Sequence, residues 1–271
     1  MKIIIITGAS DGIGAEIARQ LAASDKAEVG IVLAARDEAK LAQVAAQCEA
    51  LGARTLCVKT DVGVQAQCIA LVEQAVEEFG HIDALINNAG ISAHALFEEM
   101  KSEDLGWYED LMRVNLWGSV WCTHAALPQL KAAKGAIVAV ASLAGIVGVP
   151  GRTAYCASKF AMAGFFEALR AELRGAGVSV TTAYPGVVST NIRSRGLNAS
   201  GVAAGSSGLK EDDAMTVQEC AGLIIAGMQA REREVVMSAK GKLGRWLKLV
   251  APGLVEKMAL NALKDSVKPK T

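Results

Sequence analysis

The chain has 271 residues, of which 52% are hydrophobic and 21% charged, a balance that supports a buried core and excludes a disordered chain. Lys plus Arg and Asp plus Glu number 28 each, and this zero net charge argues against nucleic-acid binding. The six cysteines lack CxxC or other metal-ligand spacing, so we expect no metal site and a reducing, cytoplasmic compartment.

Apolar, β-branched runs alternate with longer segments of helical periodicity. The strands are expected at Lys2–Thr7, Gly30–Ala34, Thr55–Lys59, Ala84–Asn87, Ala136–Ala141 and Ser179–Tyr184. Helices are expected between them, among others at Ile13–Ala23, Glu38–Leu51, Val64–Phe79 and Tyr155–Leu173. Because strand–helix–strand repetition requires crossover connections, the sequence predicts an α/β fold. This fold is a single-domain, Rossmann-type, doubly wound parallel sheet with helices on both faces.

A glycine-rich turn lies between the first strand and the first helix. Gly8, Gly12 and Gly14 follow a Gly-x3-Gly-x-Gly spacing, with Ser10 and Ile13 between them. Glycines let a backbone approach a pyrophosphate, and the start of a helix offers free N–H groups to it. A turn needed only for tight packing would look similar. Its place at the first strand–helix junction favours a dinucleotide site.

The end of the second strand bears on the choice of cofactor. An acidic residue usually holds the free 2′-hydroxyl of NAD at this place, whereas this chain has Ala35 followed by Arg36. A guanidinium suits a 2′-phosphate, so the sequence predicts NADP(H) rather than NAD. The alternative is an ordinary solvated arginine at the start of a helix. Asp11 adds a negative charge to the turn and makes the preference less than absolute.

Polar residues also follow the third and fourth strands. Asp61 and Val62 come after one, and Asn88, Ala89 and Gly90 come after the other. Each group alone could be a turn or a helix cap. Together they occupy successive strand ends, where open α/β sheets bind ligands. We therefore expect them to contact the cofactor.

Tyr155 and Lys159 open a predicted helix at an i,i+4 spacing, which puts them on one face. A nearby ammonium favours the phenolate form of a tyrosine and suits it to proton exchange. Ser142, at the end of the fifth strand, could polarise a substrate oxygen, and Asn115 could hold a water that connects Lys159 to solvent. Tyr-x3-Lys alone is often a solvated helix face. The combination predicts a catalytic site.

With these motifs in chain order, the sequence resembles the short-chain dehydrogenase/reductase family. The matching elements are Thr7–Gly14, Asp61, Asn87–Gly90, Asn115, Ser142, Tyr155, Lys159 and Pro185-Gly186. The resemblance implies about seven strands and a Ser-Tyr-Lys mechanism assisted by Asn, in which Tyr155 protonates a carbonyl oxygen as hydride arrives.

The resemblance also implies several cofactor contacts. Lys159 would bind the nicotinamide ribose, and the carboxamide end would meet Pro185, Gly186, Val188 and Thr190. The segment Gly241–Leu263 more loosely resembles the 11β-hydroxysteroid-dehydrogenase-like branch of the family.

We expect residues 1–240 to form the catalytic domain and 241–271 to form an amphipathic C-terminal extension of it. The domain includes a substrate loop at 191–215, whose glycine-rich part is either a lid or a passive surface excursion. The nearly apolar segment Leu143–Pro150 suggests a lipophilic ketone or aldehyde as substrate, although such residues could simply pack under loops. His94 is expected to be structural.

The last 31 residues hold seven Lys/Arg and two Asp/Glu along apolar stripes. Such a segment could contact a membrane surface peripherally, cover the substrate mouth or form a subunit interface. No apolar stretch of about 18 residues predicts a spanning helix. A homodimer or homotetramer is also expected, because the helices around Asn115 and Tyr155 carry large apolar faces. A core-only role is the alternative. The apolar residues concerned are Trp117, Trp121, Phe160, Phe165, Phe166 and Leu169.

Two other functions compete with catalysis. A nucleotide-binding sensor would be expected to lack Tyr155 or Lys159, and both are present. A sugar-nucleotide epimerase or dehydratase would need a sizeable extra substrate domain. The short remainder after Pro185 leaves little room for one.

Overall fold

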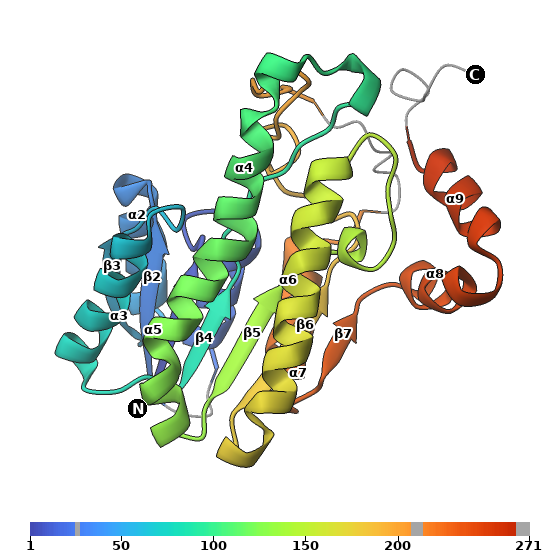
Figure 1. The fold of residues 1–271 in the computed structure, drawn as a ribbon. Helices are drawn as coiled ribbons and strands as arrows, with labels where there is room; N and C mark the ends of the chain where they lie inside the picture. The colour runs from blue at the N-terminus through green and yellow to red at the C-terminus, as the bar shows by residue number, and fades with distance from the viewer. Residues whose placement is uncertain (25–27, 207–213, 264–271) are drawn as a thin grey trace.

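A seven-stranded parallel sheet forms the centre of the computed structural model, which describes residues 1–24, 28–206 and 214–263 (Figure 1). Its strands are β1 (Lys2–Thr7), β2 (Val29–Ala35), β3 (Arg54–Lys59), β4 (Ala84–Asn87), β5 (Ala136–Val140), β6 (Ser179–Tyr184) and β7 (Glu234–Val236). The strand order is β3-β2-β1-β4-β5-β6-β7, so the winding direction reverses between β1 and β4. Ligands of open α/β sheets bind at such a switch point, beyond the carboxyl ends of the strands.

Helices cover both faces of the sheet because successive strand residues point to opposite sides. The helices are α1 (Gly12–Ala22), α2 (Glu38–Glu49), α3 (Gln65–Phe79), α4 (Gly106–Met112), α5 (Gly118–Ala132), α6 (Thr153–Glu172), α7 (Val217–Gln229), α8 (Ala239–Val250) and α9 (Pro252–Asn261). In β1, Ile4 and Ile6 belong to the core shared with α1, α2 and α7. Ile3 and Ile5 belong to the opposite core, shared with α3, α5 and α6.

The predicted fold class is confirmed, and each predicted strand is present within a residue or two of its expected bounds. The seventh strand, β7, was not located from the sequence. It has only three residues, and its Val235 packs against Gly227 of α7. The glycine-rich part of the predicted substrate loop falls partly on residues 207–213, which lie outside the described residues.

The apolar faces expected to mediate oligomerisation divide into two groups. Phe166 and Leu169 lie in the core, so their apolar character needs no partner. Trp117 and Phe160, in contrast, are 48% and 37% exposed on the outer side of the helical layer. The homo-oligomer stays a prediction that only the second pair supports.

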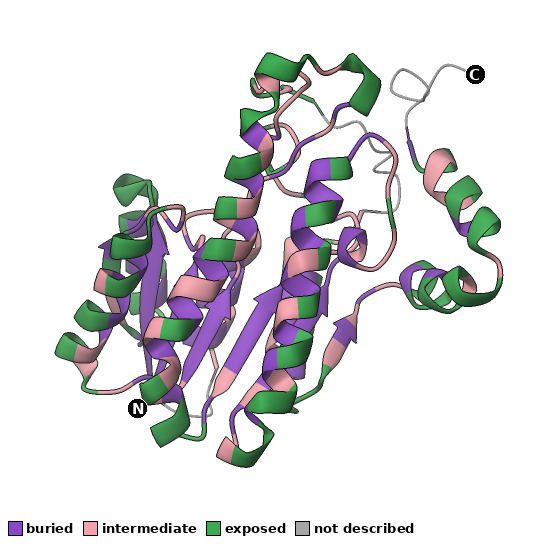
Figure 2. Cartoon of the chain, in the orientation of Figure 1, coloured by how far each residue is buried: buried purple, intermediate pink, exposed green. Residues whose placement is uncertain are grey.

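Helices α8 and α9 stand beyond β7 at the edge of the molecule (Figure 1). Helix α8 meets the body at Gly241, where an added Cβ would lie 2.5 Å from Cδ2 of Leu143, and through Lys248, which donates to the Ile146 carbonyl at 2.9 Å. Its apolar residues Leu243, Trp246 and Val250 are 53%, 71% and 81% exposed, and most of the helix is exposed in Figure 2. The amphipathic helix therefore turns its apolar face outward, opposite to the usual arrangement in a globular protein.

Candidate active site

The glycine-rich turn after β1 is built by close backbone approaches. Gly8 has φ +67° and lies so near β4 that an added Cβ would be 2.8 Å from Cα of Ala89. At Gly14 an added Cβ would be 2.4 Å from the carbonyl oxygen of Gly8. Ser10 and Ile13 are partly exposed in the same turn. The predicted glycines are thus needed by the local geometry as well as by a ligand.

Hydrogen bonds of Thr7 and Asn88 connect this turn to the end of β4. The Thr7 hydroxyl accepts hydrogen bonds from the N–H groups of Asn88 and Ala89, each at 3.0 Å. The Asn88 side-chain amide donates to the carbonyl oxygens of Thr7 at 2.9 Å and Gly8 at 3.2 Å. Sequence analysis gave Thr7 no role of its own, because its partners are more than 80 residues away in the chain.

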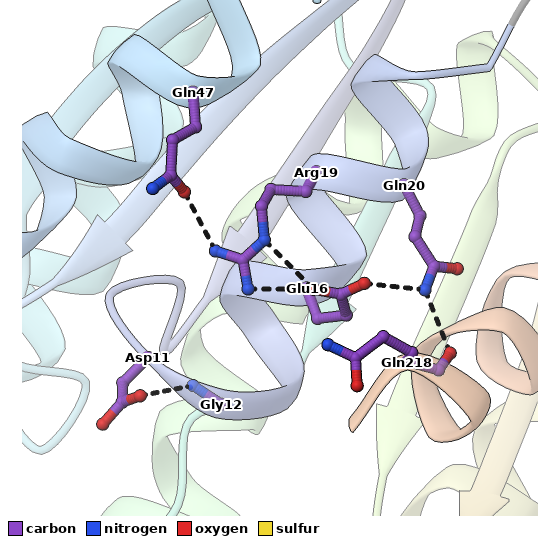
Figure 3. Close-up of polar contacts among 7 residues, drawn as sticks. All are labelled: Asp11, Gly12, Glu16, Arg19, Gln20, Gln47 and Gln218. Carbon is purple, nitrogen blue, oxygen red and sulfur yellow. Dashed lines mark hydrogen bonds and ion pairs between the residues drawn. The ribbon is translucent and has the colours of Figure 1, made fainter. Parts of the chain in front are cut away.

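Helix α1 is held in place by a polar network on its second turn (Figure 3). Arg19 donates to Glu16 at 2.9 Å and to Gln47 of α2 at 3.1 Å. Gln20 donates to Glu16 at 2.9 Å and to the backbone carbonyl of Gln218 in α7 at 3.0 Å. The N-terminus of α1, whose first N–H groups have no helical acceptor, is thereby fixed beyond the sheet edge.

Asp11 joins the glycine-rich turn to the substrate loop. Its carboxylate caps α1 through the N–H of Gly12 at 2.7 Å and accepts from Arg195 at 2.6 Å and Asn191 at 3.4 Å. Partial burial alone would raise the pKa of Asp11, but hydrogen bonds from Arg195, Gly12 and Asn191 outweigh it and hold this pKa below its usual value. A cavity of about 430 Å³ lies between the two segments.

Arg36 follows β2 at the other end of the candidate cofactor groove. It is exposed and forms no hydrogen bond or ion pair with any described residue. The neighbouring carboxylate, Asp37, is turned to the start of α2, where it accepts from the N–H of Lys40 at 3.1 Å. Asp37, next to Arg36 in the chain, is therefore engaged elsewhere, while the guanidinium has no partner among the described residues.

The other predicted cofactor residues gather along the same edge. Asp61 accepts from the N–H of Gly63 at 2.9 Å, and Val62 packs against Gly118 at the start of α5. Beyond β6, the Pro185 carbonyl accepts from the N–H of Leu143 at 2.9 Å. Farther on, Val188 is buried, an added Cβ at Gly186 would lie 3.3 Å from Leu143, and one at Gly12 would lie 3.4 Å from Thr190. The loop after β6 therefore lies over the glycine-rich turn.

Tyr155 and Lys159 lie side by side on the first turns of α6. Both are buried, and the Lys159 ammonium is 6.0 Å from the centre of the Tyr155 ring. Lys159 Nζ donates to the Val140 carbonyl at 3.0 Å, next to the end of β5. Burial lowers the pKa of Lys159 to about 8. This ammonium can therefore exchange its proton much nearer to neutral pH than an exposed lysine can.

Ser142 and Gly90 bring two further strand ends to this helix. The Ser142 hydroxyl accepts from the N–H of Ala144 at 3.2 Å, which starts a tight turn. In that turn an added Cβ at Gly145 would lie 2.7 Å from the Lys159 carbonyl oxygen. An added Cβ at Gly90 would lie 3.6 Å from Lys159 Nζ. The ends of β4 and β5 thus meet at Lys159.

Asn115 lies in a π-helical turn (Arg113–Trp117) between α4 and α5, a geometry often found at functional sites. Its amide accepts from the N–H of Ile91 at 2.8 Å and donates to the Ile91 carbonyl at 3.0 Å and to Ser158 Oγ at 2.9 Å. Ser158 in turn donates to the Tyr155 carbonyl at 2.8 Å. These bonds connect Asn115 to α6, the helix that carries Tyr155 and Lys159. The water relay expected of Asn115 stays a prediction.

Sequence analysis missed Arg152, which immediately precedes α6. Its guanidinium carbon lies 4.2 Å from the centre of the Tyr155 ring. The available signal was an arginine one helical turn ahead of the candidate catalytic tyrosine. Neither periodicity nor motif spacing distinguishes such a residue from a solvated one.

Comparison with known proteins identifies the family. A sequence profile described as short chain dehydrogenase matches residues 2–199. The chain belongs to the short-chain dehydrogenase/reductase family. It is an oxidoreductase of the Rossmann fold, and among its relatives is an 11-beta-hydroxysteroid dehydrogenase-like 4A from Arabidopsis thaliana. The two are 35% identical over 260 residues, covering 94% of this chain and 82% of the relative.

Other relatives agree with this assignment. A dehydrogenase/reductase SDR family protein 7-like from Dictyostelium discoideum is 31% identical, with 98% of this chain and 83% of that protein covered. A Burkholderia phymatum short-chain dehydrogenase/reductase solved with NAD has a TM-score of 0.78 and 27% identity, covering 93% of this chain and 94% of that one. A Thermococcus sibiricus alcohol dehydrogenase complexed with 5-hydroxy-NADP shares the fold, with a TM-score of 0.75, 23% identity and coverage of 88% and 96%.

Two other kinds of site are absent from the described part of the chain. Within it, no group of three or more His, Cys, Asp or Glu residues is arranged to hold a metal ion. Within the same residues, no helix is both long and apolar enough to cross a lipid bilayer.

Proposed function

We propose that this protein is an NADPH-dependent oxidoreductase that transfers a hydride between the nicotinamide and a carbonyl compound or secondary alcohol. The observation that carries the proposal is the burial of Tyr155 and Lys159 together, at the sheet edge where β4 and β5 end. The relatives and the glycine-rich turn support a nicotinamide cofactor at that edge.

In this proposal the cofactor, when bound, supplies or accepts the hydride. Tyr155 donates a proton to the carbonyl oxygen during reduction and accepts one from the alcohol during oxidation. Lys159, whose ammonium lies 6.0 Å from the centre of the Tyr155 ring, exchanges its own proton near neutral pH. Ser142 donates a hydrogen bond to the substrate oxygen, and Asn115 holds α6 through Ser158.

The proposed function is tested by following NADPH oxidation with aldehydes, aliphatic ketones, steroids and 3-oxoacyl compounds. We expect turnover of at least one of these carbonyl classes. A lipophilic ketone or aldehyde is the preferred class because Leu143–Pro150 is nearly all apolar. Tight NADPH binding without turnover of any class would instead favour the nucleotide-sensor alternative.

The preference for NADP(H) rests on Arg36. This guanidinium has no partner among the described residues, and Asp37 caps α2 instead of facing a ribose. The negative charge of Asp11, which could have opposed a phosphate, is bonded to Arg195 and Asn191. Asp11 and Asp37 are thus engaged elsewhere, which supports recognition of a 2′-phosphate by Arg36.

Replacing Arg36 with leucine should raise the KM for NADPH about 10- to 100-fold and leave the KM for NADH within about twofold. The reason is that a hydrogen bond to a charged group contributes roughly 1.5–3 kcal/mol and NADH lacks the phosphate. Steady-state kinetics with both cofactors measure the effect. Arg54→Leu is the matched control, since Arg54 is an exposed arginine that pairs with Glu78 at the amino end of β3, whereas Arg36 follows the carboxyl end of β2. Equal KM changes for both cofactors would refute the preference.

We also propose that 241–271 is an extension of the catalytic domain whose outward face contacts an anionic lipid surface from the cytoplasm. Trp246 and Val250 are highly exposed, and Lys242 lies on the flank of the same face. Apolar side chains flanked by lysine match a bilayer interface with acidic headgroups. The six unpaired cysteines support a reducing compartment.

Sedimentation with vesicles of phosphatidylcholine and phosphatidylserine tests this surface. We expect the full chain to bind these vesicles, to bind pure phosphatidylcholine more weakly, and to lose binding in Trp246→Glu. Leu51→Glu, at a similarly exposed leucine beyond α2, should bind as wild type does. If Trp246→Glu instead turns a dimer into a monomer, the face is a subunit interface. Unchanged sedimentation of Trp246→Glu would contradict lipid contact.

A further inference from the structure

Arg152 is a buried cation directly beside the candidate catalytic tyrosine. It is 9% exposed, and its guanidinium carbon lies 4.2 Å from the centre of the Tyr155 ring. The ammonium of Lys159 is farther from the ring, at 6.0 Å. Of these two cations, Arg152 is therefore the nearer to the ring of this phenol, on the side of the loops expected to receive substrate.

The charge of Arg152 has no acidic partner. Within the described residues Arg152 forms no ion pair, and its side chain makes one hydrogen bond, from Nη2 to the Ser92 hydroxyl. Its Nε–H group is buried without an acceptor. A buried guanidinium is costly unless it is paired, so this arrangement calls for an acceptor that the described residues do not supply.

His94 provides a second buried nitrogen that has no hydrogen-bond partner among the described residues, and its ring packs against the residue before Arg152. Its Nε2 atom is buried without a hydrogen bond, and the ring packs against Gly151, where an added Cβ would lie 3.0 Å from Nε2. Burial and the charge of Arg152 lower the pKa of His94, which keeps the ring neutral at pH 7 with one N–H to donate.

Stacking on Tyr155 does not account for these groups. A cation over a ring uses the face of the guanidinium, whereas its N–H donors point outward in its plane. A carboxylate fits those donors in shape and charge. It would also compensate the buried positive charge of Arg152. If Arg152 and His94 only stabilised the fold, both Arg152 Nε and His94 Nε2 would remain without a hydrogen-bond partner.

We propose that Arg152, assisted by His94, binds a carboxylate of the substrate, so that the protein acts on oxo acids or hydroxy acids. The inference rests on the proposed function and narrows its substrate class. Because Arg152 touches the Tyr155 ring, the carboxylate lies only a few bonds from the reacting carbonyl. In this arrangement the apolar segment Leu143–Pro150 contacts the hydrocarbon part of such a substrate.

Matched acid and ester substrates test the proposal. The probes are 4-oxodecanoate and 5-oxodecanoate, each compared with its methyl ester, with NADPH as donor. We expect wild type to prefer the acid, and Arg152→Met to lower kcat/KM about 100-fold for the acid but less than about threefold for the ester. This loss is that of a hydrogen-bonded charge pair. Arg152→Lys should recover part of the preference.

Two further measurements separate the possible roles of Arg152. Thermal unfolding of Arg152→Met should give a Tm equal to or above that of wild type, because an unpaired buried charge is removed. Calorimetric binding of 5-oxodecanoate should weaken in the variant even if no substrate is turned over. The binding measurement therefore still tests the role of Arg152 if the protein turns over no substrate and the proposed function is wrong. Conversely, wild-type turnover of neutral ketones preserves the proposed function when the acid preference fails.

Three outcomes would overturn the assignment of Arg152. These are an equal loss of kcat/KM for acid and ester, a wild type that does not distinguish them, and calorimetric binding that Arg152→Met leaves unchanged. The first would instead make Arg152 a positioning residue for Tyr155.

Discussion

Tyr155→Phe should lower kcat for carbonyl reduction by about 10²–10⁴-fold and leave the Kd for NADPH within about twofold. The hydroxyl of Tyr155 makes no hydrogen bond to any described residue, so its removal costs the fold little. It does remove the group proposed to protonate the substrate oxygen. Stopped-flow or steady-state NADPH oxidation measures kcat, and fluorescence titration of NADPH measures Kd.

Tyr184→Phe is the matched control for this variant. Tyr184 is also a buried tyrosine near the sheet edge, but burial, followed by the charge of Glu234, raises the pKa of its phenol to about 12. A phenol held neutral in this way has no part in proton exchange near neutral pH. We expect Tyr184→Phe to retain kcat within about threefold. Full activity in Tyr155→Phe would overturn the enzymatic assignment.

Gly14→Ala should both destabilise the protein and weaken NADPH binding more than tenfold. The added Cβ would lie 2.4 Å from the Gly8 carbonyl oxygen and 2.5 Å from the Asn88 side-chain nitrogen. Neither neighbour can move cheaply, because both belong to the hydrogen-bonded joint between β1 and β4. Overpacking of this kind costs about 1–3 kcal/mol of unfolding free energy. Urea denaturation and NADPH titration measure the two effects.

Gly222→Ala is the matched control, and we expect it to have the opposite effect on the stability of the protein. Gly222 lies within α7, which packs on α1, and the nearest atom to an added Cβ is Gln20 Oε1 at an ordinary 3.5 Å. Since alanine favours a helix by up to about 1 kcal/mol over glycine, this variant should be slightly more stable than wild type. Equal stability of the two variants would contradict the close approach of the backbones at Gly14.

The sheet could be predicted from the sequence because its signal is local and repeated. Runs such as Ile3–Ile6 are apolar at every position, which is expected only for a strand covered on both sides. Strand β7 carries no such signal, because its three residues are recognisable only by what they pack against. Likewise, the outward orientation of α8 could not be read from its periodicity, which is the same in either orientation.

Some residues of the candidate site could likewise be predicted from local sequence patterns, and others could not. Gly8, Tyr155 and Lys159 stand out through fixed spacings within one turn or one helix. The contacts of Asp11 with Arg195 join residues 184 positions apart, and the clustering of Arg152 with His94 depends on how two loops fold together. The π-helical turn at Asn115 also lacks a sequence pattern, since it differs from an α-helix only in backbone geometry.

The contact between α8 and the loop after Ser142 has a consequence for how this protein can change. Gly241 faces the body of the molecule without a side chain, and Gly244 is the other buried residue of α8. Side chains add to this attachment on the same side, where Lys248 donates to the Ile146 carbonyl at 2.9 Å and Arg245 pairs with Glu234. The exposed residues Leu243, Trp246 and Val250 take no part in it. Substitutions at these three positions can therefore accumulate while the loop after Ser142 keeps its packing.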